Sequence, residues 1–388
     1  MSKKILFCAS VFREDINSAG RHMIDLVREF DRQGFGCEVV TNVGHVREDL
    51  PNTEVRSIGF GLRGMSKPLR LLFEMCTPFA LYLRQLAPGH PTYDAAVSFS
   101  PSIFWYFYLW LVKRRIQGKK ILILRDIFPL WLADIEMLST KSMTYRVLNY
   151  FCQRQLKSYD VILVQNENDM EILSRNYQID CEIDVLHNWY SPSKKMPVVA
   201  EVTEFCNPQA FTLAVVGNFG PAQDLVHTSV ILQSLLEEFP DVRILFIGQG
   251  DEARRYFADN LNQIQDRIRF EDRMSHDMVM NTLAYVDAGY FSLDEKNQQG
   301  HFPGKVLAYL MAGRPVFGFA GVDASISKML KNEGFGVVIH SREKHDIIKD
   351  FRAFKSRTWP NLKIQENAHK LYGSLKAFET VAGHIKNE

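Results

Sequence analysis

The chain has 388 residues, of which 46% are hydrophobic and 23% are charged, and its formal net charge is +1. This length and balance predict a globular protein of about two domains, because a domain usually holds roughly 100–200 residues. The near-neutral charge excludes a global electrostatic field for binding nucleic acid. The six cysteines follow neither CxxC nor Cys/His ligand spacing, so we expect buried free thiols in a reducing cytoplasm.

The first half of the chain alternates β-rich runs with segments of helical period. An amphipathic helix is predicted over residues 18–33, where apolar residues recur on one face and Gly34 ends the pattern. Strands that alternate with helices are typical of a doubly wound parallel sheet. Strands are predicted at residues 3–10, 37–42, 93–100, 119–126, 160–166 and 183–188.

Residues 192–208 interrupt the alternation with prolines, mixed charge and no clear period, which is typical of a linker. The alternation then resumes, with strands predicted at 211–218, 242–250, 267–270, 288–293, 315–320 and 336–340. We therefore predict an α/β protein of two Rossmann-like, doubly wound domains that face each other across a cleft. The predicted domains are 1–195 and 209–360, and a helical tail, 361–388, is expected to pack back on the first domain.

The turn that follows the first predicted strand of the second half contains Gly217, Asn218 and Gly220. Glycines in such a turn let backbone N–H groups approach an anion closely. A tight strand-to-helix turn also needs glycine for its own geometry, which is the alternative. The motif is not GxGxxG, so it gives little support for a nicotinamide cofactor.

A second candidate in this half is the predicted helix that begins at Gly304 and Lys305. A lysine in the first turn opposes the positive end of the helix dipole, at a cost of about 0.3–1 kcal/mol unless an anion compensates it. A phosphate would do so, and a solvent-facing lysine is the alternative. Arg273, between a predicted strand and a predicted helix, is either a ligand contact or a surface arginine.

Two loops of the first half also follow predicted strands. Arg125 and Asp126 end an apolar strand, so Asp126 could orient a sugar hydroxyl and Arg125 a phosphate. Alternatively, Asp126 caps the next helix and forms an ion pair with Arg125. Gly20 and His22 lie at the start of the first helix, and His22 is either a ligand contact or a structural histidine.

Five segments together resemble the retaining enzymes of glycosyltransferase family 4, which have the GT-B fold. The resemblance is greatest to bacterial sugar transferases that build O-antigen, capsule or exopolysaccharide on lipid carriers. The segments occur in family order and span most of the chain: RDIFP (125–129), VLHNWY (185–190), VVGNFGPAQDL (215–225), FIGQGDE (246–252) and FPGKVLAYLMAGRPV (302–316).

The resemblance implies transfer of a sugar, with retention at the anomeric carbon, from a nucleotide sugar to a saccharide or polyprenyl-diphosphate-linked acceptor. It implies catalytic roles for Asp126 and Lys305 and no metal or other cofactor, since no DxD-type carboxylate pair ends a strand. The implied donor-binding residues are Gly217, Asn218, Gly220, Arg273, Gly304 and Lys305. The implied acceptor-binding residues are Gly20, His22, Arg125 and Asp126.

The sequence departs from the family in two places, the helix that begins at Gly304 and the first glycine turn of the second half, after which Pro221, Ala222 and Gln223 stand where a basic residue is usual. Many relatives carry two glutamates with E-x7-E spacing around this helix, and Gly300 and Ala308 occupy those positions here. A carboxylate that accepts hydrogen bonds from a ribose is worth roughly 1.5–3 kcal/mol. These departures keep a second hypothesis open, in which a catalytically degenerate GT-B protein binds a nucleotide sugar or a partner. A sugar-nucleotide epimerase of the same fold is a third, weaker hypothesis.

Two segments of the first half raise the question of membrane contact. The apolar run 103–112 is followed by Lys113, Arg114 and Arg115 and is about half as long as a spanning helix. The segment 67–86 is amphipathic and basic. Each is either a helix that lies at an anionic membrane surface or a helix buried in the core. We accordingly expect a cytoplasmic protein, and peripheral association with the inner face of the plasma membrane is a hypothesis.

Overall fold

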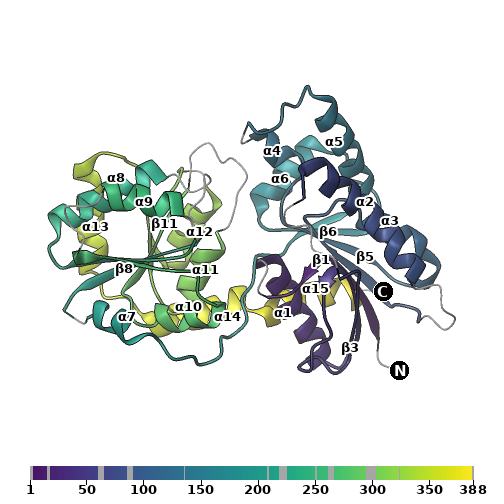
Figure 1. The fold of residues 1–388 in the computed structure, drawn as a ribbon, viewed down its shortest axis with the longest axis horizontal. Coiled ribbons are helices and arrows are strands. Elements are labelled where there is room, and N and C mark those ends of the chain that lie inside the picture. The colour runs from purple at the N-terminus through teal and green to yellow at the C-terminus, as the bar shows by residue number, and fades with distance from the viewer. Residues whose placement is uncertain are drawn as a thin grey trace. The chain divides into compact units, whose positions relative to one another are not determined.

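The computed structural model divides the chain into two compact units (Figure 1). Unit 1 comprises Met1–Trp189 and Ser374–Glu388, and unit 2 comprises Tyr190–Gly373. The residues that the structure describes are 3–14, 18–59, 65–84, 91–134, 136–207, 209–217, 225–249, 251–260, 266–293, 303–322 and 324–386.

Unit 1 is built on a parallel sheet of seven strands among its described residues, in the order β3-β2-β1-β4-β5-β6-β7. The chain moves outward from β1 to one edge and then from β4 to the other, so the switch point lies between β1 and β4. The strands are β1 Lys4–Phe12, β2 Gly36–Gly44, β3 Thr53–Ser57, β4 Ala95–Phe99, β5 Lys120–Leu124, β6 Val161–Val164 and β7 Glu182–Val185.

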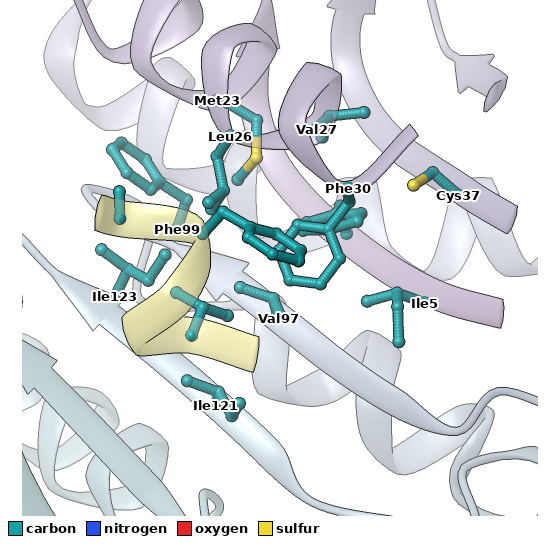
Figure 2. Close-up of a cluster of buried hydrophobic side chains, with 14 of the residues drawn as sticks. Ile5, Met23, Leu26, Val27, Phe30, Cys37, Val97, Phe99, Ile121 and Ile123 are labelled. Carbon is teal, nitrogen blue, oxygen red and sulfur yellow. The ribbon is translucent and has the colours of Figure 1, made fainter. Parts of the chain in front are cut away.

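Helices cover both faces of this sheet. Figure 2 shows the core on one face, where Phe30 of α1 packs among apolar side chains of the central strands. Helix α15, from the far end of the chain, completes this core, since the rings of Phe378 and Phe30 lie 4.7 Å apart. The helices are α1 Ser18–Arg32, α2 Lys67–Arg84, α3 Trp105–Leu111, α4 Leu130–Asp134, α5 Met143–Leu156, α6 Glu167–Asn176 and α15 Ser374–Lys386.

Unit 2 repeats the plan with six described strands, in the order β10-β9-β8-β11-β12-β13, and its switch point lies between β8 and β11. Its strands are β8 Phe211–Val216, β9 Val242–Ile247, β10 Ile268–Glu271, β11 Ala288–Ser292, β12 Val316–Phe319 and β13 Gly336–Ile339. Its helices are α7 Ala200–Phe205, α8 Leu225–Glu238, α9 Asp251–Asn260, α10 His276–Leu283, α11 Gly304–Met311, α12 Ser325–Glu333, α13 Lys344–Ser356 and α14 Asn361–Tyr372.

The chain passes between the units at other residues than the sequence suggested. The first crossing lies at Trp189–Tyr190, before the expected end of the first domain at residue 195. The second lies at Gly373–Ser374, so α14 belongs to unit 2 and only α15 packs in unit 1. The physical reason is the apolar face of α14, whose Ile364, Ala368 and Tyr372 are buried in the unit 2 core.

The apolar run 103–112 is largely a core segment. Its residues Ile103, Phe104, Trp105, Tyr108, Leu109 and Val112 are buried, whereas Trp110 is 60% exposed. Helix α3 covers seven residues of the run. Among the described residues, no helix combines the length and the hydropathy that a membrane span requires.

Candidate functional site

Each unit holds its own group of candidate residues, and each group lies at the carboxyl edge of the parallel sheet of that unit. In unit 2, β8 and β9 both end in glycine with positive φ, 137° at Gly217 and 157° at Gly248. A Cβ atom on Gly248 would lie 1.7 Å from the carbonyl oxygen of Gly217, so the two backbones touch there. The close approach requires glycine at position 248, and the positive φ of Gly217 favours glycine there for a structural reason of its own. Asn218 and Gly220 lie outside the described residues.

Helix α11 presents the second feature of this half. Val306, Leu307 and the rest of the helix through Met311 are buried in the unit 2 core, while Gly304 and Lys305 at its start are half-buried. Among the described residues, none forms a hydrogen bond or an ion pair with the Lys305 ammonium. Burial lowers the pKa of Lys305 to about 8.

These features make the start of α11 a poor place for a cation unless an anion is present. The helix dipole already places partial positive charge there, and burial removes the water that would otherwise solvate the ammonium. A diphosphate would compensate both the positive end of the helix dipole and the lost solvation of the ammonium, and it would raise the pKa of Lys305 again. The arrangement is therefore chemically suited to stabilising an anionic leaving group.

Two further residues of unit 2 bear on the donor side. Arg273 is exposed in the loop between β10 and α10, where Ser275 caps α10 by accepting a hydrogen bond from the backbone N–H of Met278 at 3.3 Å. Ala308, where the resemblance to family 4 places a glutamate, is 3% exposed and packs in the core. Gly300, at the other position, lies outside the described residues.

In unit 1, the sequence candidates His22 and Arg125 meet. The Nη1 atom of Arg125 lies 3.0 Å from Nδ1 of His22, which is buried. A guanidinium can only donate, so Nδ1 accepts and the ring carries its proton on Nε2. Trp189 also holds the first turns of α1, because its indole N–H donates to the carbonyl oxygen of His22 at 3.0 Å.

Arg125 also belongs to a buried polar network that sequence reasoning missed. Its backbone N–H donates to Ser100 Oγ at 2.8 Å, and its carbonyl oxygen accepts from the Gln165 amide. The Oε1 atom of Gln165 accepts from the Asn188 amide at 2.7 Å. Ser100, Arg125, Gln165 and Asn188 follow β4, β5, β6 and β7, so a polar residue in the last two positions of each predicted strand was the available signal.

Asp126 is half-buried beside this network. No hydrogen bond or ion pair links its carboxylate to any residue in the part of the chain that the structure describes. The alternative in which Asp126 caps the next helix and pairs with Arg125 is therefore not what the structure shows, since Arg125 donates to His22 instead. The carboxylate is available to accept a hydrogen bond from a ligand.

Gly20 has a packing role in the first turn of α1. A Cβ atom at this position would lie 2.2 Å from the carbonyl oxygen of Arg13 and 2.9 Å from Cγ1 of Val11. Only glycine allows α1 to begin this close to the end of β1. Within the described ranges, no group of three His, Cys, Asp or Glu side chains is placed to hold a metal ion.

No protein-family model matches the chain. The chain is 24% identical over 231 residues to the probable glycosyltransferase WbjE of Pseudomonas aeruginosa, a match that covers 58% of this chain and 57% of WbjE. The chain thus spans little more than half the length of that relative.

Solved structures match over almost the full chain. WaaG, a glycosyltransferase involved in lipopolysaccharide biosynthesis, matches with a TM-score of 0.69 and 15% identity, over 98% of this chain and 100% of that one. Sucrose-phosphate synthase from Thermosynechococcus elongatus gives 0.73 and 11%, over 98% of both chains. Anabaena HepE in complex with UDP and glucose gives 0.67 and 12%, over 100% of both. The expected fold class is therefore confirmed: two Rossmann-like parallel-sheet domains of the GT-B type.

Proposed function

We propose that the chain is a retaining glycosyltransferase of family 4 type that transfers a sugar from a nucleotide sugar to a lipid-linked saccharide acceptor. The observation that carries the proposal is the half-buried Lys305 at the start of α11, with no anionic partner among the described residues. The similarity to WbjE and the fold shared with WaaG and HepE support the same reaction class. Synthesis of a cell-surface polysaccharide such as O-antigen or capsule is the pathway class that fits this acceptor.

In the proposed reaction, the bond from the anomeric carbon to the donor diphosphate breaks, and a bond to an acceptor hydroxyl oxygen forms on the same face of the sugar. Lys305 and the N–H groups at the start of α11 stabilise the departing nucleoside diphosphate. Gly217, Asn218, Gly220 and Gly304 bind the diphosphate, and Arg273 lies toward the base. The hydroxyl proton leaves with the diphosphate or passes to solvent.

On the acceptor side, we assign Asp126 to the acceptor hydroxyl and His22 and Arg125 to the rest of the saccharide. The carboxylate of Asp126 gives an acceptor for sugar hydroxyls, and the ring of His22 contributes by lying 3.0 Å from the guanidinium of Arg125. Gly20 acts by letting α1 begin close to β1. The proposed reaction includes no metal or other cofactor, and the nucleotide sugar is a co-substrate.

A lipid-linked acceptor would bring the chain to a membrane, and unit 1 carries a surface suited to this. Helix α2 exposes Leu69, Leu72, Phe79 and Leu83 by 40–63%, at a spacing that places them on one face. Helix α3 packs beside α2 through the rings of Phe107 and Phe79, 5.4 Å apart. We call these four α2 side chains the α2 stripe.

Basic residues occur in the same two segments of unit 1, in α2 and just after α3. Helix α2 contains three basic residues, Lys67, Arg70 and Arg84, against one acidic residue, Glu74, which pairs with Arg70 at 3.1 Å. Lys113 and Arg114 follow α3 and are exposed, close to the exposed Trp110. We call Arg70, Arg84, Lys113 and Arg114 the basic rim; apolar side chains together with such basic residues favour peripheral binding to anionic lipid at the inner face of the plasma membrane.

The test of the reaction is release of a nucleoside diphosphate. The protein is incubated with UDP-glucose, the ligand named for HepE, and with other nucleotide sugars, each with a polyprenyl-diphosphate-linked saccharide. Acceptor-dependent release is expected, and Lys305→Ala should reduce it by about 100-fold or more. Lys328→Ala, which removes an exposed lysine of α12, is the matched control and should leave the rate unchanged.

The second candidate function is a GT-B protein that binds a nucleotide sugar without turnover. The observation that favours it is Ala308, because a core alanine stands where many relatives have a carboxylate. Saturable binding of a nucleotide sugar without release to any acceptor would support this candidate and contradict the transferase.

A further inference from the structure

The central strands of unit 2 separate at the switch point. The β8–β9 ladder continues to the end of β8, with Val216 opposite Ile247. The β8–β11 ladder stops earlier, and its last pair is Gly289 opposite Ala214. The next bond of a parallel ladder would join the N–H of Val216 to the carbonyl oxygen of Tyr290.

The hydroxyl group of Tyr309 takes the place of that missing bond. Its Oη atom accepts from the backbone N–H of Val216 at 2.9 Å and donates to the carbonyl oxygen of Tyr290 at 3.0 Å. A side chain from α11 thus links the two strands where their backbones no longer pair. Burial raises the pKa of Tyr309, so the hydroxyl keeps the proton that it donates to Tyr290.

The ring of Tyr309 is held as firmly as its hydroxyl. The side chain is fully buried, and it lies flat on Gly289, where a Cβ atom would approach the ring to 2.1 Å. Any other residue at position 289 would therefore displace the ring. Gly289 and Tyr309 together form a wedge between β8 and β11, and we call this pair the Tyr309 wedge.

The Tyr309 wedge connects the two parts of the donor half-site. Val216, which donates to Tyr309, directly precedes the Gly217 turn at the end of β8. Lys305 lies four residues before Tyr309, so the two side chains project from the same face of α11, one turn apart. The hydroxyl therefore sets the separation between the Gly217 turn and the start of α11, the two places assigned to the donor diphosphate.

We propose that Tyr309 is a positioning residue for the nucleotide-sugar diphosphate, because its hydroxyl holds β8 and β11 apart and fixes Lys305 over the opening. This inference rests on the proposed function, since it concerns the same donor half-site. Tyr309 acts through Lys305 and the Gly217 turn and does not touch the ligand.

The test variant is Tyr309→Phe in the full chain, which keeps the ring on Gly289 and removes the hydroxyl. The KM for the nucleotide sugar and the Kd for the nucleoside diphosphate should each rise by about tenfold, while the KM for the acceptor stays within about twofold. Thr212→Val is the matched control, since it removes a buried hydroxyl from the opposite end of β8. It should change thermal stability but neither constant.

Unchanged donor constants in a folded Tyr309→Phe protein would overturn the inference while leaving the transferase reaction intact. Equal rises in the KM values for donor and acceptor would also overturn it, because they would indicate general loss of structure. If wild-type protein binds no nucleotide and transfers no sugar, the proposed function fails instead.

Hydrogen exchange supplies a readout that does not depend on activity or on the folding of the variant. The Val216 amide of the wild-type protein should exchange slowly without any ligand, because Tyr309 accepts its hydrogen. Fast exchange at Val216, beside slow exchange at Leu213 in the paired part of the same strand, would show that the wedge is open and would overturn the inference.

Discussion

At the scale of single residues, Lys305 leads to a prediction about the pH dependence of UDP binding, because its pKa of about 8 lies near neutral pH. The ammonium of the free protein loses its proton as the pH rises through this value, so attraction for an anion should fall. The affinity for UDP should weaken by about tenfold between about pH 7 and about pH 10. Isothermal titration calorimetry in buffers of different ionisation enthalpy measures both this change and the accompanying proton uptake.

Two variants control this measurement. Lys305→Arg should bind UDP with little dependence on pH over the same range, since a guanidinium stays charged. Lys305→Met should bind weakly at every pH. The lowered pKa of Lys305 also affects the stability of the unliganded protein. Between about pH 8 and the ordinary pKa of 10.5, the unfolded chain holds more protons than the folded one. The contribution of Lys305 to the free energy of unfolding therefore rises with pH in that range. A flat wild-type profile would show that the ammonium does not meet the diphosphate.

Asp126 gives a second prediction at this scale. Its carboxylate has no partner among the described residues, so Asp126→Asn should leave the melting temperature almost unchanged. The kcat for transfer should fall by about 100-fold or more, and the KM for the nucleotide sugar should stay constant. Asp180→Asn, which changes an exposed carboxylate in the same unit, is the control. A loss of stability with unchanged kcat would give Asp126 a structural role.

Single residues also show how far the sequence alone can lead. The pattern placed Arg125 and His22 on separate loops as candidates, and the structure joins them by a hydrogen bond of 3.0 Å. A polar residue at the end of a predicted strand marked Gln165, but its bonding partners and the role of Tyr309 were not predictable. Each depends on which strands become neighbours in the sheet, and periodicity does not encode that order.

At the scale of elements, α15 is notable because it ends the chain and yet belongs to unit 1, which is formed mainly by the first half of the sequence. Phe378 is 7% exposed and packs against Phe30 of α1. Phe378→Ala should lower the free energy of unfolding of unit 1 by about 3–5 kcal/mol, because it leaves a cavity between α1 and α15. Urea unfolding followed by the fluorescence of Trp189 measures this change.

Leu375→Ala is the matched control on the same helix. Leu375 is 50% exposed, so its loss should change the free energy of unfolding by less than about 0.5 kcal/mol. Equal effects of the two substitutions would mean that α15 does not stabilise unit 1 through its apolar face.

The elements were predicted best where the spacing of apolar residues in the sequence matches the burial of those residues in the structure. The predicted parallel strands at residues 119–126 and 160–166 contain β5 and β6, because a strand buried on both faces is apolar throughout. The run 103–112 was ambiguous, since a buried helix and an interfacial helix share the same composition. Its resolution as a mostly buried segment required knowing that α2 and α5 pack beside it.

At the scale of the whole molecule, the two sheets could be predicted from the alternation of strands and helices. The points where the chain passes between the units could not. They depend on whether the apolar face of α14 packs in unit 1 or unit 2. A helical period predicts an apolar face but does not predict which part of the protein that face packs against. The core contacts of Ile364 and Tyr372 decide this question in favour of unit 2.

The proposed membrane contact concerns the whole molecule, and the α2 stripe makes it testable. Sedimentation with vesicles of equal parts phosphatidylglycerol and phosphatidylcholine should carry down the wild-type protein at low salt and release it at high salt. Leu72→Ser with Leu83→Ser should weaken binding by about tenfold or more, because each exposed leucine contributes apolar area to the lipid contact. Vesicles of phosphatidylcholine alone should bind poorly, since the basic rim then has no anionic headgroups to attract it.

Leu362→Ser is the control for this experiment, since Leu362 is 77% exposed on α14 of unit 2, away from the α2 stripe in the chain. The control should bind vesicles as well as the wild type. Equal binding by the stripe variant would show that the α2 stripe does not meet lipid, and so would a wild-type protein that stays wholly in solution at low salt. If the stripe variant instead abolishes a concentration-dependent dimer, a second copy of the chain covers this face. The α2 stripe would then not be available to lipid, and the basic rim alone would not suffice to hold the protein at a membrane.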